Sequence, residues 1–426
     1  MAAVAREVAA NIPWWREPTK DQWYAWVAAW LGWTLDAFDF TAFLLIMVPI
    51  SKEFGVPLTE VTAVLAITLW MRFVGATANG WLADRIGRRT PLMISIGWYS
   101  VCNFIAGLAP SFFILFLFRA LLGIGMAAEW PAGAALAMET WPVRSRGFMG
   151  AVLQGSWGLG FLLSSAIYGL FYSYIGWRGM LMIGIAPALL IVYIRIFVKE
   201  PPVWIENRRQ QQLQNREVRA PLFSIFKRGL LGNTVTTCLM MASAFIIYYA
   251  NYGLFATHLQ LDLKLGPGLV ALPIALANAC VFISSMLWGW VADRRGRRWA
   301  VAIPAMLGVP TAFVYLLIPD YGWIVFGFAL QGMFAGGDLW SGMPAYLSER
   351  FPTEVRATAV AFCFHQGAIW GGLISPLLVW YATSHQIALS GPILVTTVVG
   401  LAMFLIAVLL SPETKGRVLI ADLTVA

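Results

Sequence analysis

Three ionisable residues lie deep inside apolar runs long enough to cross a bilayer, where charged side chains are costly and are retained for a function. Counted at about 1.5 Å of helical rise per residue, Asp36 lies roughly 20 Å and Asp39 roughly 24 Å into the first run, and Arg72 roughly 17 Å into the second. A guanidinium stays charged at such depth and binds a carboxylate through two hydrogen bonds. Arg72 is therefore predicted to anchor an anionic substrate, the alternative being a permanent ion pair with Asp36 or Asp39.

The two acidic residues are three positions apart and project from nearly one face of a helix. Two carboxylates so close together in a low dielectric cannot both ionise cheaply, so one of them is expected to hold a proton. We predict that Asp36 and Asp39 couple transport to protons and that Asp36 also contributes to the substrate site. A purely structural hydrogen-bonding role is the alternative, and the spacing does not decide which member titrates.

Further ionisable residues fall inside later apolar runs. Arg119 matches the depth of Asp39 and is a second candidate for substrate binding, with an ion pair between helices as the alternative. Glu129, Asp338 and His365 are predicted to share a layer nearer the cytoplasm. That layer could serve as a second proton site, as a gate, or only as hydrogen bonding between helices.

Polar and aromatic residues complete the predicted site. Gln154 lies near the start of a glycine- and serine-rich run and is assigned to substrate binding. His258 and Asp262 come late in the seventh run and are predicted at the outer mouth, where a solvated rim is the alternative. Some deep tryptophans are candidates for lining a cavity: Trp70, Trp157, Trp340 and Trp370.

The composition requires membrane-spanning elements to position these side chains. Of the 426 residues 60% are hydrophobic and only 12% are charged, far from the roughly 25% charged of a soluble domain. We predict an all-helical integral membrane protein with twelve spans in two six-helix bundles. The predicted spans are 23–50, 60–83, 90–109, 111–138, 146–174, 177–198, 229–256, 267–292, 299–319, 321–348, 356–383 and 389–411.

The basic residues predict the orientation of the chain. They cluster in alternate loops, which places both termini in the cytoplasm and explains the net charge of +8 without a nucleic-acid partner. We expect a multi-pass protein of the inner (cytoplasmic) membrane, surrounded by lipid and monomeric. The predicted divisions are a cytoplasmic N-terminus 1–22, a bundle 23–198, a cytoplasmic linker 199–228 with a short surface helix, a bundle 229–411 and a cytoplasmic tail 412–426.

An internal repeat supports the division into halves. The segment GWLADRIGRR at 80–89 recurs as GWVADRRGRR at 289–298, and Glu139-x-x-Pro142-x-x-x-Arg146 recurs 210 residues later from Glu349. Parallel six-helix repeats are a transporter architecture. The aspartates and arginines of these loops are predicted to form charge-assisted contacts between helix ends and not to touch substrate.

The duplicated loops resemble the signature of the major facilitator superfamily, in which they hold one gating state together. The resemblance implies gating roles for residues of both loops: Gly80, Asp84, Arg85, Gly87, Arg88, Gly289, Asp293, Arg294, Gly296 and Arg297. The first half more narrowly resembles the sialate:proton symporter family, which includes lactate and pyruvate permeases. The carrying segments are LGWTLDAFDF at 31–40, LWMRFVG at 69–75, RALLGIG at 119–125, Glu129-Trp130, ETWP at 139–142, WRGM at 177–180 and KEPPVW at 199–204.

The seventh run departs from the lactate permeases of that family. Thr257, His258 and Asp262 match their pattern, whereas Leu254, Gln260 and Leu261 stand at its Asn, Ser/Thr and Gln positions. Lactate is therefore less favoured than other carboxylates. The D-x-x-D of the first run is also similar to that of aromatic acid:proton symporters, which keeps that group open.

These observations predict a secondary transporter, a proton-coupled symporter of a small organic anion such as a monocarboxylate (lactate, pyruvate) or sialic acid. The alternatives are an aromatic acid:proton symporter, a proton-driven efflux antiporter for hydrophobic cations, and, more distantly, a membrane sensor without transport. No phosphate-binding loop, nucleophile motif or metal-ligand spacing occurs, so an enzyme is not expected, and no cofactor or metal.

Overall fold

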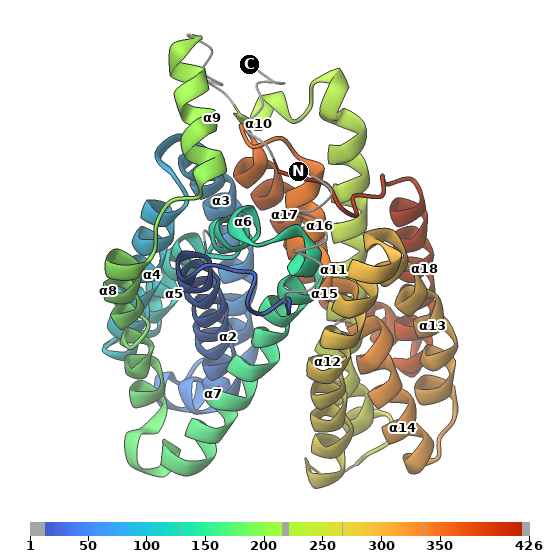
Figure 1. The fold of residues 1–426 in the computed structure, drawn as a ribbon. Helices are drawn as coiled ribbons and strands as arrows, with labels where there is room; N and C mark the ends of the chain where they lie inside the picture. The colour runs from blue at the N-terminus through green and yellow to red at the C-terminus, as the bar shows by residue number, and fades with distance from the viewer. Residues whose placement is uncertain (1–12, 128, 215–220, 266, 337, 420–426) are drawn as a thin grey trace.

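All the regular structure in the described part of the chain is helical. The computed structural model describes residues 13–419 apart from residues 128, 215–220, 266 and 337. Figure 1 shows two helical bundles side by side, one at the blue end of the chain and one at the red end. The first comprises α2 (Lys20–Phe54), α3 (Leu58–Ile86), α4 (Arg89–Gly107), α5 (Phe112–Met126), α6 (Glu129–Thr140), α7 (Arg146–Met182) and α8 (Ala188–Phe197).

The second bundle follows two short connecting helices, α9 (Pro202–Leu213) and α10 (Pro221–Ser224). Short non-α segments occur at Val143–Ser145 and Ile183–Ile185, which are 3-10 turns, and at Gly332–Gly336, which is a π-helix. The helices of the second bundle are α11 (Arg228–Leu261), α12 (Pro267–Arg295), α13 (Arg297–Leu317), α14 (Tyr321–Gln331), α15 (Asp338–Ser341), α16 (Met343–Arg350), α17 (Arg356–His385) and α18 (Ser390–Leu409).

Local sequence sets the limits of α2, the helix with both acidic candidates. Thr19 and Gln22 form a capping box: the Thr19 hydroxyl accepts the Gln22 N–H, and the Gln22 side chain accepts the Thr19 N–H at 2.7 Å. The helix ends where Gly55 adopts a left-handed conformation with φ 64°. Its 35 residues exceed the predicted span 23–50 and bring Asp36 and Asp39 to its middle.

The helical break between the fifth and sixth predicted spans is due to one glycine. Gly176 has φ 62° and ψ −172°, a backbone conformation that only glycine adopts without strain, and it divides the continuous run Arg146–Met182. The break falls between residues 174 and 177, the boundary predicted from the sequence. The predicted linker helix is also present as α9, whose Trp204 donates from its indole N–H to the Asp84 carbonyl at 3.2 Å.

Seven stretches of the described residues are long and apolar enough to cross a membrane. The other five predicted spans fall on α2, α3, α4, the first part of α7 and the interrupted segment α14 to α16. These helices bury polar or charged side chains within the protein or are broken into short pieces, which lowers their apolar character. The number of helices that qualify as membrane spans by length and hydropathy, seven, is therefore lower than the twelve spans predicted.

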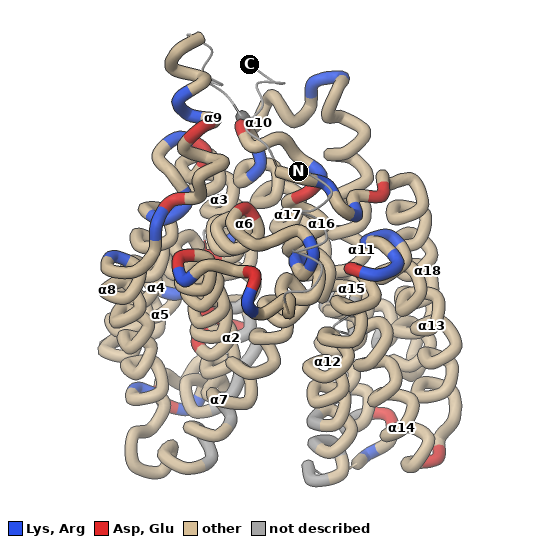
Figure 2. Tube along the Cα trace, viewed as in Figure 1, with Lys and Arg blue, Asp and Glu red and all other residues tan. Residues whose placement is uncertain are grey.

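Charged residues gather at one end of the molecule. We call this the basic end, defined by the turns that join α3 to α4, α6 to α7, α12 to α13 and α16 to α17. Figure 2 shows Lys, Arg, Asp and Glu concentrated there, with few at the opposite end. The two bundles approach each other at the basic end, and α7 and α12 diverge toward the opposite end (Figure 1).

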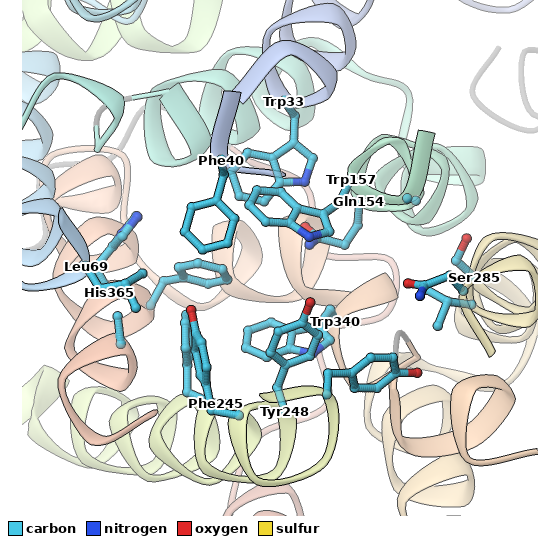
Figure 3. Close-up of a pocket in the computed structure, with 18 of the residues that line it drawn as sticks. Trp33, Phe40, Leu69, Gln154, Trp157, Phe245, Tyr248, Ser285, Trp340 and His365 are labelled. Carbon is cyan, nitrogen blue, oxygen red and sulfur yellow. The ribbon is translucent and has the colours of Figure 1, made fainter. Parts of the chain in front are cut away.

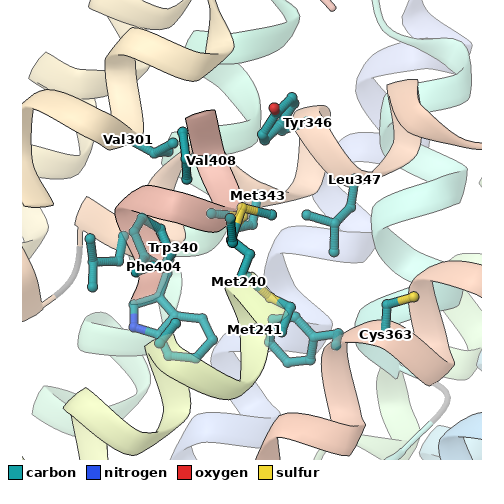
Figure 4. Packing of buried hydrophobic residues seen from close by; sticks show 14 of the residues in the cluster. Met240, Met241, Val301, Trp340, Met343, Tyr346, Leu347, Cys363, Phe404 and Val408 are labelled. Carbon is teal, nitrogen blue, oxygen red and sulfur yellow. The ribbon is translucent and has the colours of Figure 1, made fainter. Parts of the chain in front are cut away.

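The largest apolar core lies in the second bundle. Met240, Met241, Met343 and Phe404 pack there with no exposed surface (Figure 4). Trp33 and Trp130 of the first bundle join the same cluster. Apolar packing therefore continues from one bundle into the other at the level where the candidate site lies.

Candidate functional site

A cavity of about 100 Å³ lies between the two bundles. Figure 3 shows aromatic rings around it, contributed by α2 and α7 from one side and by α11, α15 and α17 from the other. Among the described lining residues Arg72 is the one Lys, Arg, Asp or Glu side chain. The lining includes Trp33, Phe40, Arg72, Gln154, Trp157, Phe245, Tyr248, Tyr249, Tyr252, Asn278, Ser285, Trp340, Phe364 and His365.

Arg72 and Asp36 form a buried ion pair at the cavity wall. The guanidinium Nη2 donates to Asp36 Oδ2, and the two side chains are 7% and 0% exposed. The Arg72 guanidinium also lies 5.7 Å from the Trp33 ring centre and 6.0 Å from that of Trp157. The ion pair with Asp36 that was the alternative for Arg72 is therefore present, and the same arginine lines the cavity, where its role as a substrate anchor stays a prediction.

Asp39 and Arg119 lie together but away from the cavity. Both are fully buried, and neither is among the lining residues. Arg119 donates from Nη1 to Asn103 Oδ1 at 3.1 Å and lies over the Phe43 ring at 4.1 Å, and its charge acts on Asp39. Asn103 is the polar neighbour of Asp39, but neither Asp39 oxygen has a hydrogen bond of normal geometry to the described residues. The predicted match in depth is observed, and Arg119 lies outside the cavity lining.

Glu129 lies behind the Arg72–Asp36 pair, within the first bundle. It is 1% exposed, and the charges of Asp36 and Arg72 act on it. Tyr99 is its polar neighbour, but neither Glu129 oxygen has a hydrogen bond of normal geometry to the described residues. Gly32 of α2 makes the room for it, because a Cβ there would come within 2.1 Å of Glu129 Oε1. Glu129 thus adjoins the predicted proton-binding pair.

The predicted layer of Glu129, Asp338 and His365 is divided in the structure. His365 of α17 lies on the cavity wall, with Nδ1 3.2 Å from the Ala361 carbonyl oxygen and Nε2 without a hydrogen-bond partner among the described residues. The Asp338 side chain lies outside the described residues. Glu129 and His365 therefore do not form one layer with a shared contact: the first faces the interior of its bundle and the second faces the cavity.

Gln154 belongs to the cavity wall, as predicted. Its Oε1 accepts the indole N–H of Trp130 at 2.9 Å, and the Trp130 ring stacks on Phe364 with centres 3.8 Å apart. Because Phe364 belongs to the second bundle, this stack joins the two bundles beside the cavity.

His258 and Asp262 lie at the opposite end from the basic end, as predicted, but they do not line an open mouth. His258 is 4% exposed, and its Nδ1 lies 2.6 Å from Asp262 Oδ2. Asp262 also accepts the Leu389 N–H at 2.8 Å, which ties the end of α11 to the start of α18. The pair stabilises a helix junction inside the second bundle, and the burial of His258 differs from the solvated rim that was the alternative.

The duplicated loops make the same contacts twice at the basic end. Asp84 accepts the N–H groups of Ala357 and Thr358 at 3.1 and 2.9 Å, so α3 of the first bundle caps the N-terminus of α17 in the second. Asp293 accepts the N–H groups of Gly147 and Phe148 at 2.9 and 2.7 Å, so α12 caps α7 in return. The predicted contacts between helix ends are present.

Arginine–glutamate pairs follow the same duplication. Arg88 binds Glu139 at 3.0 Å and Arg297 binds Glu349 at 3.1 Å, each within one bundle. Contacts between the bundles extend both pairs: Arg356 reaches Glu139 at 2.6 Å and Arg146 reaches Glu349 at 3.4 Å. These hydrogen bonds and ion pairs join the bundles at the basic end of the described structure.

The paired glycines of the loops permit close contacts. A Cβ on Gly80 would lie 2.7 Å from the Ala361 Cβ, and one on Gly289 would lie 2.4 Å from the Ala151 Cβ. Gly87 and Gly296 have φ of 103° and 110°, which favour glycine. The cations Arg85 and Arg294 lie over the neighbouring rings of Trp81 and Trp290, 4.5 and 4.1 Å from their centres.

Two glutamates at these loops were not identified from the sequence. Glu200 accepts the N–H groups of Arg88 and Arg89 at 2.7 and 2.9 Å, and Glu413 accepts those of Arg297 and Arg298 at 2.8 and 3.1 Å. Burial raises the pKa of Glu200, although the two N–H groups and the Arg88 charge oppose this shift. Each of these glutamates stands next to a proline just after the last helix of its half, as Glu200-Pro201 and Pro412-Glu413, which is only a weak sequence signal for such a contact.

The aromatic wall of the second bundle was also missed. Phe245, Tyr248, Tyr249 and Tyr252 of α11 all line the cavity, and their spacing of three or four residues places them on one helical face. That spacing could have been read from the sequence. Of the candidate tryptophans, Trp157 and Trp340 line the cavity, whereas Trp70 and Trp370 are 43% and 52% exposed and do not.

The arrangement of two bundles around a central site, with duplicated contacts at one end, is that of an alternating-access transporter. The family model described as Major Facilitator Superfamily matches residues 29–279 and 237–419. The chain therefore belongs to the major facilitator superfamily, whose members are transporters and not enzymes.

Relatives and solved structures agree with this assignment. The chain is 26% identical over 380 residues to the sialic acid transporter NanX of Escherichia coli, covering 87% of this chain and 90% of NanX. It is 28% identical over 420 residues to a probable 4-methylmuconolactone transporter of Cupriavidus pinatubonensis, covering 95% and 93%. The fold matches that of the proton:xylose symporter XylE with a TM-score of 0.71 at 18% identity, over 93% of this chain and 97% of XylE. The chain is thus a multi-pass membrane transporter.

Proposed function

We propose that this transporter carries a small organic anion together with protons across the inner membrane. The observation that carries the proposal is the Arg72–Asp36 ion pair at the wall of an otherwise mainly aromatic cavity. A buried guanidinium whose counter-ion is another side chain can exchange that partner for a substrate carboxylate of the same geometry. The names of the relatives NanX and the probable 4-methylmuconolactone transporter support a small metabolite as the substrate class.

Exchange of partners provides a route to coupling. A substrate carboxylate bound to Arg72 would release Asp36, which is 0% exposed and would then be a buried charge without a partner. Protonation of Asp36 removes that cost, so anion binding and proton binding favour each other. Asp39 and Glu129, which lack hydrogen bonds of normal geometry to the described residues, lie beside Asp36 and can pass on or hold the proton.

The contacts between the bundles support one step of the cycle. They join the bundles at the basic end, which the distribution of basic loops predicts to be cytoplasmic. The conformation is then the one closed toward the cytoplasm. Anion and proton would enter from the outside, and the contacts at Asp84 and Asp293 would break when the site opens inward.

The test is uptake into proteoliposomes with and without an inwardly directed proton gradient. A panel of lactate, pyruvate, benzoate, muconate and sialic acid, with hydrophobic cations as the opposing class, separates the candidates. We expect at least one acid to accumulate only with the gradient. Uptake of acids that persists unchanged when the gradient is collapsed would contradict coupling, cation efflux would support the antiporter, and binding without flux would support the sensor.

A second candidate, an aromatic or other planar conjugated acid, is favoured by the cavity itself. Trp33, Trp157, Tyr249 and Phe364 offer faces on which a flat ring can stack. The volume of about 100 Å³ is of the order of the roughly 150 Å³ cavity that holds benzene in an engineered protein. These features favour a compact flat acid over a bulky sugar acid.

Phe364 provides a direct test of this candidate. We expect Phe364→Leu to weaken binding of benzoate about three- to tenfold, since an aromatic pair contributes about 0.5–1.5 kcal/mol beyond its buried area. Binding of pyruvate should change less, because it has no ring. Quenching of the cavity tryptophans provides the readout, and Phe326→Leu on an exposed face of α14 is the matched control. Equal losses for both acids would argue against ring stacking.

A further inference from the structure

A second cavity, of about 300 Å³, lies at the basic end outside the transport site. It is formed by the start of α11, the turn between α16 and α17, and the segment after α18. Its lining contains three arginines and no acidic residue in the described part of the chain. The lining residues are Gly229, Leu230, Asn233, Arg350, Phe351, Pro352, Arg356, Arg417, Val418 and Leu419.

Arg350 is the buried charge of this cavity. It is 1% exposed, and its two terminal nitrogens donate to neutral oxygens only: Nη1 to Ser411 Oγ at 2.9 Å, and Nη2 to the Asn233 carbonyl at 3.3 Å and to the Thr236 hydroxyl. Its Nε has no hydrogen-bond partner among the described residues. The Nε–H of the guanidinium thus remains available.

The other buried arginines at this end each have a carboxylate. Arg88 and Arg356 both bind Glu139, and Arg146 and Arg297 both bind Glu349. No ion pair to Arg350 occurs among the described residues, and burial lowers its pKa because only weakly acidic groups, led by Tyr346, oppose the loss of hydration. A buried guanidinium without a counter-ion is costly, so its surroundings fit an anion that the described residues do not supply.

Two further features of the cavity attract an anion. The N-terminus of α11, a helix of 34 residues, opens onto it at Gly229, while the N–H of Leu230 donates to the Lys227 carbonyl at 2.9 Å. Arg417 lines the cavity with an exposed side chain and makes no ion pair that the described structure contains. Helix N-terminus, buried arginine and exposed arginine therefore converge from three elements.

We propose that this cavity binds a phosphate group, either free phosphate or the headgroup phosphate of an anionic lipid, with Arg350 as its principal ligand. A tetrahedral anion accepts hydrogen bonds from several directions, which suits donors that come from three sides. The cavity lies at the end of the helices, beside the predicted cytoplasmic leaflet, where basic pockets between helices meet lipid headgroups.

The position of the cavity links its occupancy to the gate. Arg356, which lines it, holds Glu139 of the first bundle, and the backbone carbonyl of Arg417 accepts a hydrogen bond from Arg146 at 3.1 Å. A bound phosphate would fix both arginine-bearing segments in place. Occupancy therefore favours the conformation closed at the basic end and does not involve the substrate cavity.

The experiment measures phosphate binding by the purified full-length protein in nonionic detergent. Equilibrium dialysis with radiolabelled orthophosphate tests free phosphate, and native mass spectrometry tests phosphatidylglycerol against a glycolipid without phosphate. We expect one saturable phosphate or phosphatidylglycerol per chain and no retained glycolipid. Competition between the two probes shows that they share the site, and the tighter one identifies the source. If neither probe binds saturably, the proposal is overturned.

Variants assign the binding to this cavity. We expect Arg350→Gln to weaken binding at least about tenfold, as for loss of a charge-assisted hydrogen bond, with Arg350→Lys intermediate. Arg417→Gln at the rim should weaken it severalfold without disturbing buried packing, which keeps the test valid if Arg350→Gln misfolds. Arg209→Gln, an exposed arginine on α9, is the control. Wild-type affinity in both Arg350→Gln and Arg417→Gln would overturn the assignment.

Discussion

The basic end and the central cavity use the internal repeat in opposite ways. At the basic end each half contributes the same set: an aspartate that caps a helix of the other half, an arginine bound to a glutamate, and a glutamate that binds two loop N–H groups. In the cavity both halves contribute aromatic rings, but only the first half contributes an ion pair among the described residues, Arg72–Asp36. The contacts between the bundles therefore occur twice, whereas the ion pair to which we assign substrate recognition occurs once.

This difference explains where charge is tolerated. The duplicated ion pairs lie at helix ends, where partners and backbone groups satisfy each charge. The charges of the first bundle lie in its interior, and several of their polar atoms have no hydrogen bond of normal geometry to the described residues: both oxygens of Asp39 and Glu129, and Nε and Nη2 of Arg119. Unsatisfied polar groups in such an interior are retained for a function and not for stability.

The largest effect is expected where the chemistry is not duplicated. Arg72→Gln should reduce proton-driven acid uptake at least about thirtyfold, because loss of one partner of a buried charge pair costs roughly 2–5 kcal/mol. Arg209→Gln on α9 should leave uptake unchanged. Arg72→Gln with Asp36→Asn removes the unpaired carboxylate, so recovery of folding without recovery of uptake would assign the loss to the site.

Asp39 tests coupling separately from binding. Asp39→Asn keeps the Arg72–Asp36 pair intact, so counterflow of the acid across proteoliposomes at equal pH should fall by less than about threefold, within the range of a single lost polar interaction. Accumulation driven by a proton gradient should be lost. Retained accumulation together with retained counterflow would exclude Asp39 from the proton path and leave Asp36 or Glu129.

The two capping aspartates test the equivalence of the duplicated loops. Asp84→Asn and Asp293→Asn should both slow transport, because each weakens a contact that holds the basic end closed. Asp84→Asn should have the larger effect, by about three- to tenfold, since Asp84 also accepts the Thr358 hydroxyl at 2.7 Å and Phe148 has no hydroxyl to offer Asp293.

Thr358→Val checks the reason for that asymmetry. This variant should bring the Asp84 contact close to that of Asp293 and remove most of the difference between the two asparagine variants. Initial uptake rates, normalised to the amount of reconstituted protein, provide the measurement. If the two aspartates differ as much in the Thr358→Val background, the hydroxyl is not the cause.

The smallest effect is expected at the end opposite the basic end, where a half-exposed ion pair lies away from the contacts between the bundles. Glu53, beyond the predicted span 23–50, accepts hydrogen bonds from the Trp177 indole N–H and from Arg178, and these lower its pKa below the ordinary value of 4.5. A lowered carboxyl pKa stabilises the folded state above pH 4.5, and the contribution is lost as the pH falls through the lowered value.

Glu53→Gln should therefore lower the melting temperature by only about 1–2 °C at pH 7, since a half-exposed ion pair contributes about 1 kcal/mol or less. The difference from wild type should shrink as the pH falls below 4.5. Uptake should be unaffected. A pH-independent difference would show that packing and not the carboxylate charge is involved.

Two kinds of feature were predictable from the sequence: the duplicated loops, and the charged residues inside apolar runs. The burial of Asp36, Asp39, Arg72, Arg119 and Glu129 was predictable, because a charged residue inside an apolar run is visible in the sequence. The contacts at the basic end were predictable because the loops that make them occur twice in the sequence. The predicted boundary between the spans 146–174 and 177–198 also contains Gly176, where the helix breaks.

Other features required the structure because side-chain direction decides them. The depth of Arg119 was predictable, but whether it faces the cavity or Asn103 depends on helix rotation. His365 and Glu129 share a predicted depth and yet face different surroundings. His258 lies near the end of a span that extends past the predicted limit of 256, so proximity to an end did not imply exposure.

The central claim is that Arg72 recognises the carboxylate of the substrate. The most direct test titrates the purified protein with an acid and with its neutral primary amide, such as benzoate and benzamide, and follows quenching of the cavity tryptophans. Wild type should prefer the acid at least about tenfold, as expected for a charge-assisted pair, and Arg72→Gln should bind both equally weakly. An Arg72→Gln variant that keeps the full preference for the acid would contradict the account.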